Sequence, residues 1–337
     1  MNELASNANP SPDPRGLEPR PDSMSPSVRW VFIGPQGLRA GWRLAVYAAA
    51  FLALARLFAL IASPFLPPAN GAVPPLWVFF VGECEVLLAA IVPALVLSHI
   101  ENRPFGNYGL PLHEAIGKNF WMGALWGLLA ITLLLLVMRG IGVFYFGGLA
   151  LHGFRVLKFA GFFAVLFLIV GLFEEFAFRG YAQFTLAQGI GFWPAAIALS
   201  ALFGLSHSSN QGEAWIGELA AGLLALFLCL TLRRTGNLWF AVGIHAAWDW
   251  GETFLYSVPD SGIVVPGHLL RSSFHGSPWL TGGTVGPEGS VLIFGVLIAL
   301  WITFDSLYPA SKALGLAREP QHNSLPAHDG HAVSGPL

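Results

Sequence analysis

The chain has little charge. Asp, Glu, Lys and Arg make up 11% of its 337 residues, against about a quarter in a typical soluble protein. Hydrophobic residues reach 55% and the mean hydropathy is +0.62. Such a composition excludes an ordinary soluble domain. The sequence therefore predicts a polytopic integral membrane protein in contact with lipid.

Cysteine is also scarce, with only two residues in the chain. Cys84 and Cys229 lie within apolar runs of different segments, where a buried thiol behaves as a small hydrophobic side chain. Two isolated cysteines exclude a disulfide framework and a cysteine-based metal cluster.

Long apolar segments make up most of the sequence between its two ends. Residues 1–40 and 307–337 are polar and rich in Pro, Ser or charge, so we expect two disordered tails around a transmembrane domain at 41–306. Within that domain the apolar pattern predicts an all-α polytopic bundle of about eight spans. The spans are expected at 41–63, 75–99, 119–138, 159–187, 192–210, 215–233, 237–256 and 289–306.

Lys and Arg are more numerous in the loops that this map places on the side of both termini. The positive-inside rule therefore predicts cytoplasmic termini, and we expect a bacterial plasma membrane as the location. The sequence gives no signal for an oligomeric state, and its motifs do not imply a nucleic-acid partner.

Charged residues inside the fourth predicted span are the main exception to this pattern. Each ionised side chain near a bilayer centre costs roughly 2.5–3.5 kcal/mol, so intramembrane charges point to function. Glu175 and Arg179 are four residues apart and can pair on one helix face. Glu174 lies about 100° around the helix and needs another partner.

Three further charges lie in the first two predicted spans. Arg56 precedes the end of one span, and Glu83 and Glu85 follow the start of the next, so they meet at one depth across a helical hairpin. We favour a structural ion pair here over a proton relay.

Two histidines and an aspartate complete the intramembrane polar set. His207 ends the fifth span, while His245 and Asp249 share one face of the seventh. A lone histidine in an apolar helix is more often a satisfied core residue than a base or ligand. Together with Glu174, however, these groups can satisfy one another in one polar cavity, where a carboxylate and a histidine can activate water.

The same residues resemble the three ordered motifs of a known family. Glu174-Glu175-Phe-Ala-Phe-Arg179, Phe203-x-x-x-His207 and His245-x-x-x-Asp249 look like the signature of the CPBP family. That family comprises type II CAAX prenyl endopeptidases and bacteriocin-processing or self-immunity proteins. The resemblance covers about 75–256, and it implies a four-helix catalytic core at about 159–256.

The resemblance also implies a role for each motif residue. Glu174 would activate water with the help of His207, while Glu175 and Arg179 would brace the fourth span. His245 and position 249 would hold the tetrahedral intermediate. Many members carry Asn at that position, which can donate a hydrogen bond to an oxyanion. Asp249 must therefore be protonated for that role, or it orients His245.

A metal is an open alternative at the same residues. Glu174, His207 and His245 offer the ligand set of a catalytic Zn²⁺ with water in the fourth position. No His-Glu-x-x-His is present, and the same groups suffice for glutamate-based hydrolysis, so we favour metal-free chemistry over a single zinc ion.

We therefore expect an intramembrane endopeptidase that cleaves a membrane-anchored or lipidated protein or peptide. The alternatives are a proton-coupled transporter, which would predict inverted repeats that we do not see, and a non-catalytic immunity or scaffold protein. The site also requires His207 and Glu174 to lie at the same depth in the membrane. His207 lies about 22 Å along its span, so it can meet Glu174 only if that span is strongly tilted or starts deeper.

Overall fold

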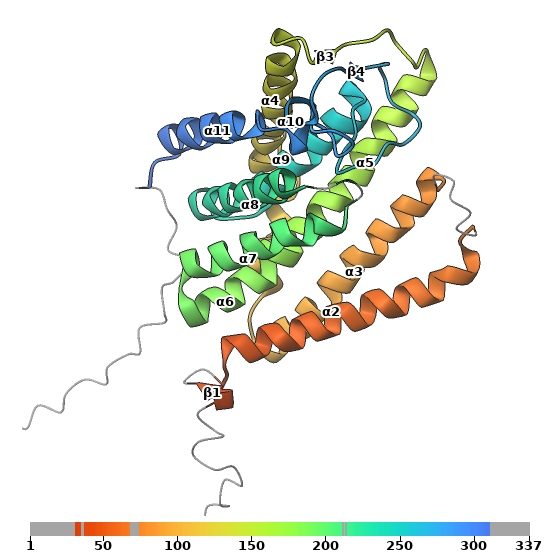
Figure 1. Cartoon of the computed structure of the whole chain (residues 1–337). Helices are drawn as coiled ribbons and strands as arrows, with labels where there is room; N and C mark the ends of the chain where they lie inside the picture. Colours follow the sequence, from red (N-terminus) through yellow and green to blue (C-terminus); the bar gives the residue numbers. More distant parts are fainter. Residues whose placement is uncertain (1–30, 35–36, 68–73, 211, 213, 311–337) are drawn as a thin grey trace, which may run out of the picture.

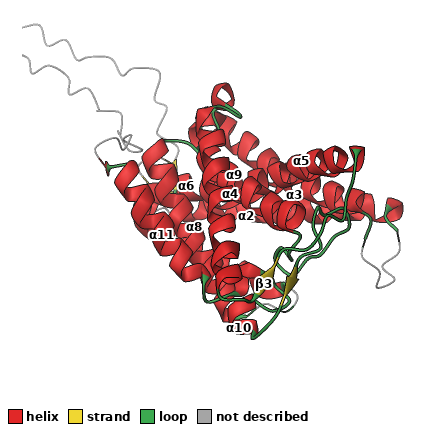
Figure 2. Cartoon of the chain, turned by 90° about the horizontal axis from the view of Figure 1, so that it is seen from above, coloured by secondary structure: helices red, strands yellow, loops and turns green. Residues whose placement is uncertain are grey.

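The computed structural model describes residues 31–34, 37–67, 74–210, 212 and 214–310. Most of both predicted tails, namely 1–30 and 311–337, lies outside these residues. The described part is a bundle of helices, with loops gathered at the end that carries β3 and α10 (Figures 1 and 2). This confirms the all-α membrane bundle.

Among the described residues, five helices are long and apolar enough to cross a membrane: Ala40–Phe65, Leu76–Ile100, Lys118–Gly140, Phe154–Ile190 and Trp215–Thr235. They contain α2 (Ala40–Ala62) with η1 (Ser63–Phe65), α3 (Leu76–Ile100), α4 (Lys118–Gly140), α5 (Phe154–Ala177), α6 (Gln183–Ile190) and α8 (Trp215–Thr235). The shorter helices are α7 (Phe192–Ser206), α9 (Trp239–Trp250), α10 (Pro278–Thr281) and α11 (Ile293–Leu307). Each predicted span coincides with helix in the structure, while the count of eight spans stays a prediction.

Two short antiparallel strand pairs stabilise loops among the described residues. β1 (Ile33–Gly34) pairs with β2 (Gly37–Leu38), and β3 (Phe144–Tyr145) pairs with β4 (Ser273–Phe274). The second pairing joins the segment after α4 to the segment before α11, so it fixes the loops at one end of the bundle (Figure 1).

The fourth predicted span is not one regular helix. A π-helical turn, η4 (Phe178–Ala182), separates α5 from α6, and Gly180 within it has a non-helical ψ of −120°. A Cβ at Gly180 would lie 2.5 Å from the Phe176 ring, so glycine is needed for this turn. An uninterrupted helix from Phe154 to Ile190 would be about 55 Å long, well beyond a hydrocarbon core of about 30 Å.

A polar cluster around the Glu101 carboxylate at the end of α3 holds this turn in place. Tyr181 of η4 donates to a Glu101 oxygen at 2.5 Å, and Tyr108 donates to the other at 2.7 Å. Arg43 of α2 pairs with the same carboxylate at 3.1 Å. Tyr108 belongs to η2 (Phe105–Tyr108), in the loop between α3 and α4.

The chain reverses direction at Gly191, and this reversal explains how His207 reaches the same depth in the bundle as Glu174. Gly191 has a φ of +86°, a conformation that glycine adopts without strain, and it joins α6 to α7. Glu174 and His207 lie at nearly equal distances along the chain on either side of it. The two residues therefore return to the same level, helped by the steep inclination of α7 to α4 (Figure 1).

Glycines allow α4 and α9 to pack at backbone contact. A Cβ at Gly123 or Gly127 of α4 would lie 2.0 Å from the Phe240 carbonyl oxygen or 2.2 Å from that of Ile244. Gly243 of α9 makes the reciprocal approach, at 2.1 Å from the Phe120 carbonyl oxygen. Small residues serve membrane helices in this way because they let backbones come close. The contact sets the position of α9, which carries His245.

Gly127→Ala is therefore expected to destabilise the bundle by about 1–3 kcal/mol, because the added methyl group forces α4 and α9 apart. The matched control is Gly161→Ala on α5, where a Cβ would meet no atom within 4 Å. Unfolding in detergent micelles, followed by circular dichroism, measures both. Equal stability of the two variants would contradict the close α4–α9 contact.

Candidate active site

A cavity of about 360 Å³ lies among α3, α5, α7, α8 and α9. All four residues predicted to be catalytic line it, namely Glu174, His207, His245 and Asp249. Three motifs that are distant in sequence thus meet at one place. The other polar side chains of its wall are Glu83, Ser206, Asn210, Thr253, Asp260, Ser261 and Glu288.

His245 lies at the centre of the carboxylates. Its Nε2 is 3.5 Å from a Glu174 oxygen and 3.6 Å from an Asp249 oxygen. The second contact follows from the spacing of four residues on α9, as the sequence predicts. Glu174 reaches the same nitrogen from α5, because the α5 and α9 helices pack side by side.

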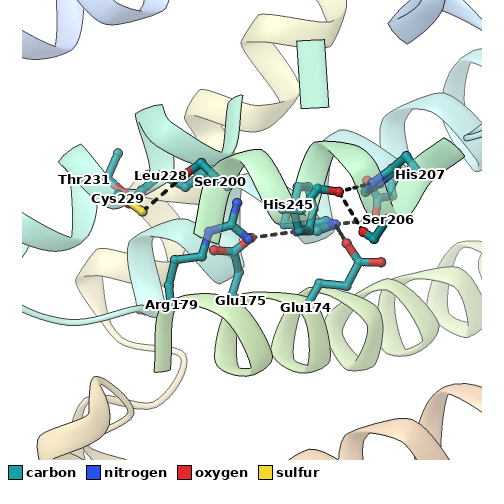
Figure 3. A network of polar contacts seen from close by, with 12 residues as sticks. Glu174, Glu175, Arg179, Ser200, Ser206, His207, Leu228, Cys229, Thr231 and His245 are labelled. Carbon is teal, nitrogen blue, oxygen red and sulfur yellow. Dashed lines mark hydrogen bonds and ion pairs between the residues drawn. The ribbon is translucent and has the colours of Figure 1, made fainter. Parts of the chain in front are cut away.

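The other nitrogen of His245 contacts Glu175, which the sequence analysis missed. His245 Nδ1 lies 2.9 Å from Glu175 Oε1, and Arg179 Nη1 lies 3.3 Å from the same oxygen (Figure 3). Glu175 and Arg179 are 0% and 1% exposed. The predicted pair is present, but Glu175 does more than brace its helix: its carboxylate accepts a hydrogen bond from the His245 Nδ1–H and so fixes the orientation of the ring.

His207 is oriented by its own helix. Its Nδ1 lies 2.8 Å from the Phe203 carbonyl oxygen, which can only accept, so Nδ1 carries the proton and Nε2 keeps a free lone pair. The Phe203 ring lies between His207, at 4.7 Å, and the Arg179 guanidinium, at 4.3 Å. Phe203 therefore joins the second motif to the first.

The predicted pairing of Arg56 with Glu83 or Glu85 is wrong. Arg56 is exposed, and no ion pair among the described residues joins it to either glutamate. Glu83 instead lines the cavity with Glu174, because α3 packs against α5 and turns this side chain inward. The spacing within a hairpin does not reveal which neighbour a helix face meets.

A second acidic group was missed altogether. Glu252 of η6 (Gly251–Tyr256), Asp260 and Glu288 of η7 (Pro287–Gly289) place carboxylate oxygens within 4.8 Å of one another. Burial and the nearby Glu288 carboxylate raise the pKa of Asp260 to about 8. The position of Glu252 was a signal in the sequence, since it follows Asp249 by three residues in the same apolar run.

The predicted zinc ligands are not gathered around one point. In the described part of the chain, Glu252, Asp260 and Glu288 form the sole group of three metal-ligand side chains with donor atoms within 4.8 Å of one another. Ligands of tetrahedral zinc lie about 3.3 Å apart, given bonds of about 2.0–2.1 Å. Glu174, His207 and His245 share the cavity without meeting this spacing, so we derive no step through a metal.

Comparison with known proteins agrees with the motifs. Residues 156–251 match the family model described as type II CAAX prenyl endopeptidase Rce1-like. The matched segment contains all three motifs and most of the cavity wall. No match was found among curated proteins or among solved structures. The five apolar helices and this match identify an integral membrane protein. The match over residues 156–251, which carries all three motifs, supports membership of the CPBP family with a core similar to the Rce1-like type.

Proposed function

We propose that this protein is an intramembrane endopeptidase that hydrolyses a peptide bond of a membrane-anchored or lipidated protein. The observation that carries the proposal is the convergence of Glu174, His207, His245 and Asp249 on one cavity between apolar helices. Such a cavity holds water and polar groups at a place where hydrocarbon surrounds the helices, as hydrolysis inside a membrane requires.

The geometry supports a glutamate-based mechanism. A water molecule between Glu174 and the free Nε2 of His207 loses a proton to the carboxylate as its oxygen attacks the peptide carbonyl. Glu174 then passes that proton to the leaving nitrogen, and the C–N bond breaks. His245, protonated on both ring nitrogens among the carboxylates of Glu174, Glu175 and Asp249, faces the same space with Nε2–H, which donates a hydrogen bond to the tetrahedral oxyanion.

Asp249 and Glu175 support that role by orienting His245. Glu175 holds Nδ1 and Asp249 approaches Nε2, so the ring is fixed from both sides. Of the two roles that the sequence left open for Asp249, the structure favours orientation of the histidine, because its carboxylate lies beside Nε2.

The apolar part of the cavity wall fits a lipid-bearing or transmembrane substrate. Besides the motif residues, α3 and α5 contribute apolar side chains to this wall, namely Leu76, Phe79, Phe163, Leu166, Phe167 and Val170. An acyl or prenyl chain, or a leucine-rich peptide, would bury its apolar surface there at about 25 cal/mol per Å².

The test is cleavage of a prenylated CAAX reporter, and of a bacterial membrane proteome, by the purified protein with and without a chelator. We expect cleavage that persists after chelation, because water activation relies on Glu174. His207→Ala is expected to lose most of it. Loss of cleavage on chelation with recovery on zinc addition would overturn the metal-free mechanism, and equal cleavage by the wild type and His207→Ala would overturn the site.

A further inference from the structure

Glu252, Asp260 and Glu288, here called the acidic triad, come from three separate pieces of chain. Glu252 lies in the turn after α9, Asp260 in the following loop, and Glu288 just before α11. Their carboxylates nevertheless gather within 4.8 Å of one another. Hydroxyl groups orient two of them, since Thr253 donates to Asp260 at 3.1 Å and Ser261 donates to Glu288 at 3.0 Å.

The third carboxylate has no such support. Glu252 is 0% exposed, and neither of its oxygens has a hydrogen-bond partner in the described part of the chain. The Trp248 indole N–H lies close enough to interact with the Glu252 carboxylate, but the two groups do not reach hydrogen-bond geometry, and no cation among the described residues neutralises the carboxylate. No ion pair between described residues brings a Lys or Arg to any member of the triad. A buried, unpaired carboxylate is so costly that such groups are normally paired or coordinate a metal.

The ligand chemistry selects the kind of cation. Three carboxylates with hydroxyl neighbours, and no nitrogen or sulfur donor among them, suit a hard divalent ion. Calcium binds oxygen at about 2.3–2.6 Å, so ligands on its opposite sides lie about 4.6–5.2 Å apart. The donor oxygens of the triad all lie within 4.8 Å of one another, so a single ion of this size can contact all three carboxylates.

We propose that the acidic triad binds a divalent hard cation such as Ca²⁺. The ion would tie the loop after α9 and the segment before α11 to the end of α9. Asp260 and Glu288 also line the catalytic cavity, so the same ion would hold one part of its wall in place. This proposal does not depend on peptidase activity.

Terbium binding to the full-length protein in detergent tests the site. Tb³⁺ replaces Ca²⁺ at oxygen ligands, and its emission is sensitised by a nearby tryptophan such as Trp248. We expect saturable emission that Ca²⁺ displaces, and at least a tenfold weaker apparent affinity in Glu252→Gln. This variant keeps the shape of the side chain and removes its buried charge, so it should fold.

Two further variants complete the test. Asp260→Asn lies in a loop and should lower the affinity similarly, even if Glu252→Gln fails to fold. Glu218→Gln removes a carboxylate from the first turn of α8 that does not line the cavity and should leave binding unchanged. Ca²⁺ should also raise the thermal midpoint of the wild type more than that of Asp260→Asn. Absence of calcium-displaceable emission in the wild type, or equal affinity in folded triad variants and wild type, would overturn the proposal.

Discussion

Glu174→Gln is expected to lower kcat/KM for cleavage by about 10²–10⁴-fold, the usual contribution of a general base. Gln keeps the size and hydrogen bonding of the side chain but cannot accept the proton of an attacking water. Its amide can still face His245 Nε2, now 3.5 Å from the carboxylate, so the fold should be preserved. Initial rates on the prenylated reporter measure the effect.

The matched control is Glu85→Gln. Glu85 is another glutamate on an apolar helix, but it does not line the cavity, so its loss should leave cleavage near the wild-type rate. A Glu174→Gln protein that retains full activity would contradict the glutamate-based mechanism. An equal loss in both variants would show that the effect is not specific to the site.

Arg179→Met is expected to lower the free energy of unfolding by about 3–5 kcal/mol, as removal of one partner of a buried ion pair does. Arg179 is 1% exposed and lies 3.3 Å from Glu175, which is fully buried. Methionine fills much of the volume, but it leaves the Glu175 carboxylate without its cation. Chemical unfolding in micelles gives the difference.

A second substitution separates charge from packing. Glu175→Gln added to Arg179→Met removes the unpaired carboxylate while keeping an acceptor for His245, so the double variant should regain part of the lost stability. Arg56→Met is the matched control, because Arg56 is exposed on α2 and should tolerate the change. If Arg179→Met is as stable as Arg56→Met, the buried pair does not stabilise the fold.

The sequence predicted the positions of the helices because long apolar runs have few alternatives in a membrane. It also selected four of the polar residues that line the cavity, since charged side chains inside a membrane need polar partners to offset the cost of desolvation. It could not show the π turn at Phe178–Ala182, because an average over hydropathy does not register a change of backbone hydrogen bonding.

Contacts between helices were the second feature that could not be predicted from the sequence. The spacing of Glu175 and Arg179 identified one partner of that carboxylate but not His245, which arrives from a helix seventy positions away. Glu83 was placed opposite Arg56 for the same reason, although packing of α3 on α5 decided otherwise. Asp260 and Glu288 lie in loops, where no periodicity indicates which residues will meet.

The two π turns, η4 and η6, bear on how this chain aligns with its relatives. η4 includes Arg179 at the end of the first motif, and η6 begins two residues after Asp249. A π turn is a helical turn with one additional residue. A homologue that keeps a regular α-helix at either place should therefore lack one residue there, because retaining that residue in a regular helix would rotate every side chain beyond it by about 100°. Single-residue gaps in an alignment at these two places would thus mark changes of backbone geometry, and not errors of alignment.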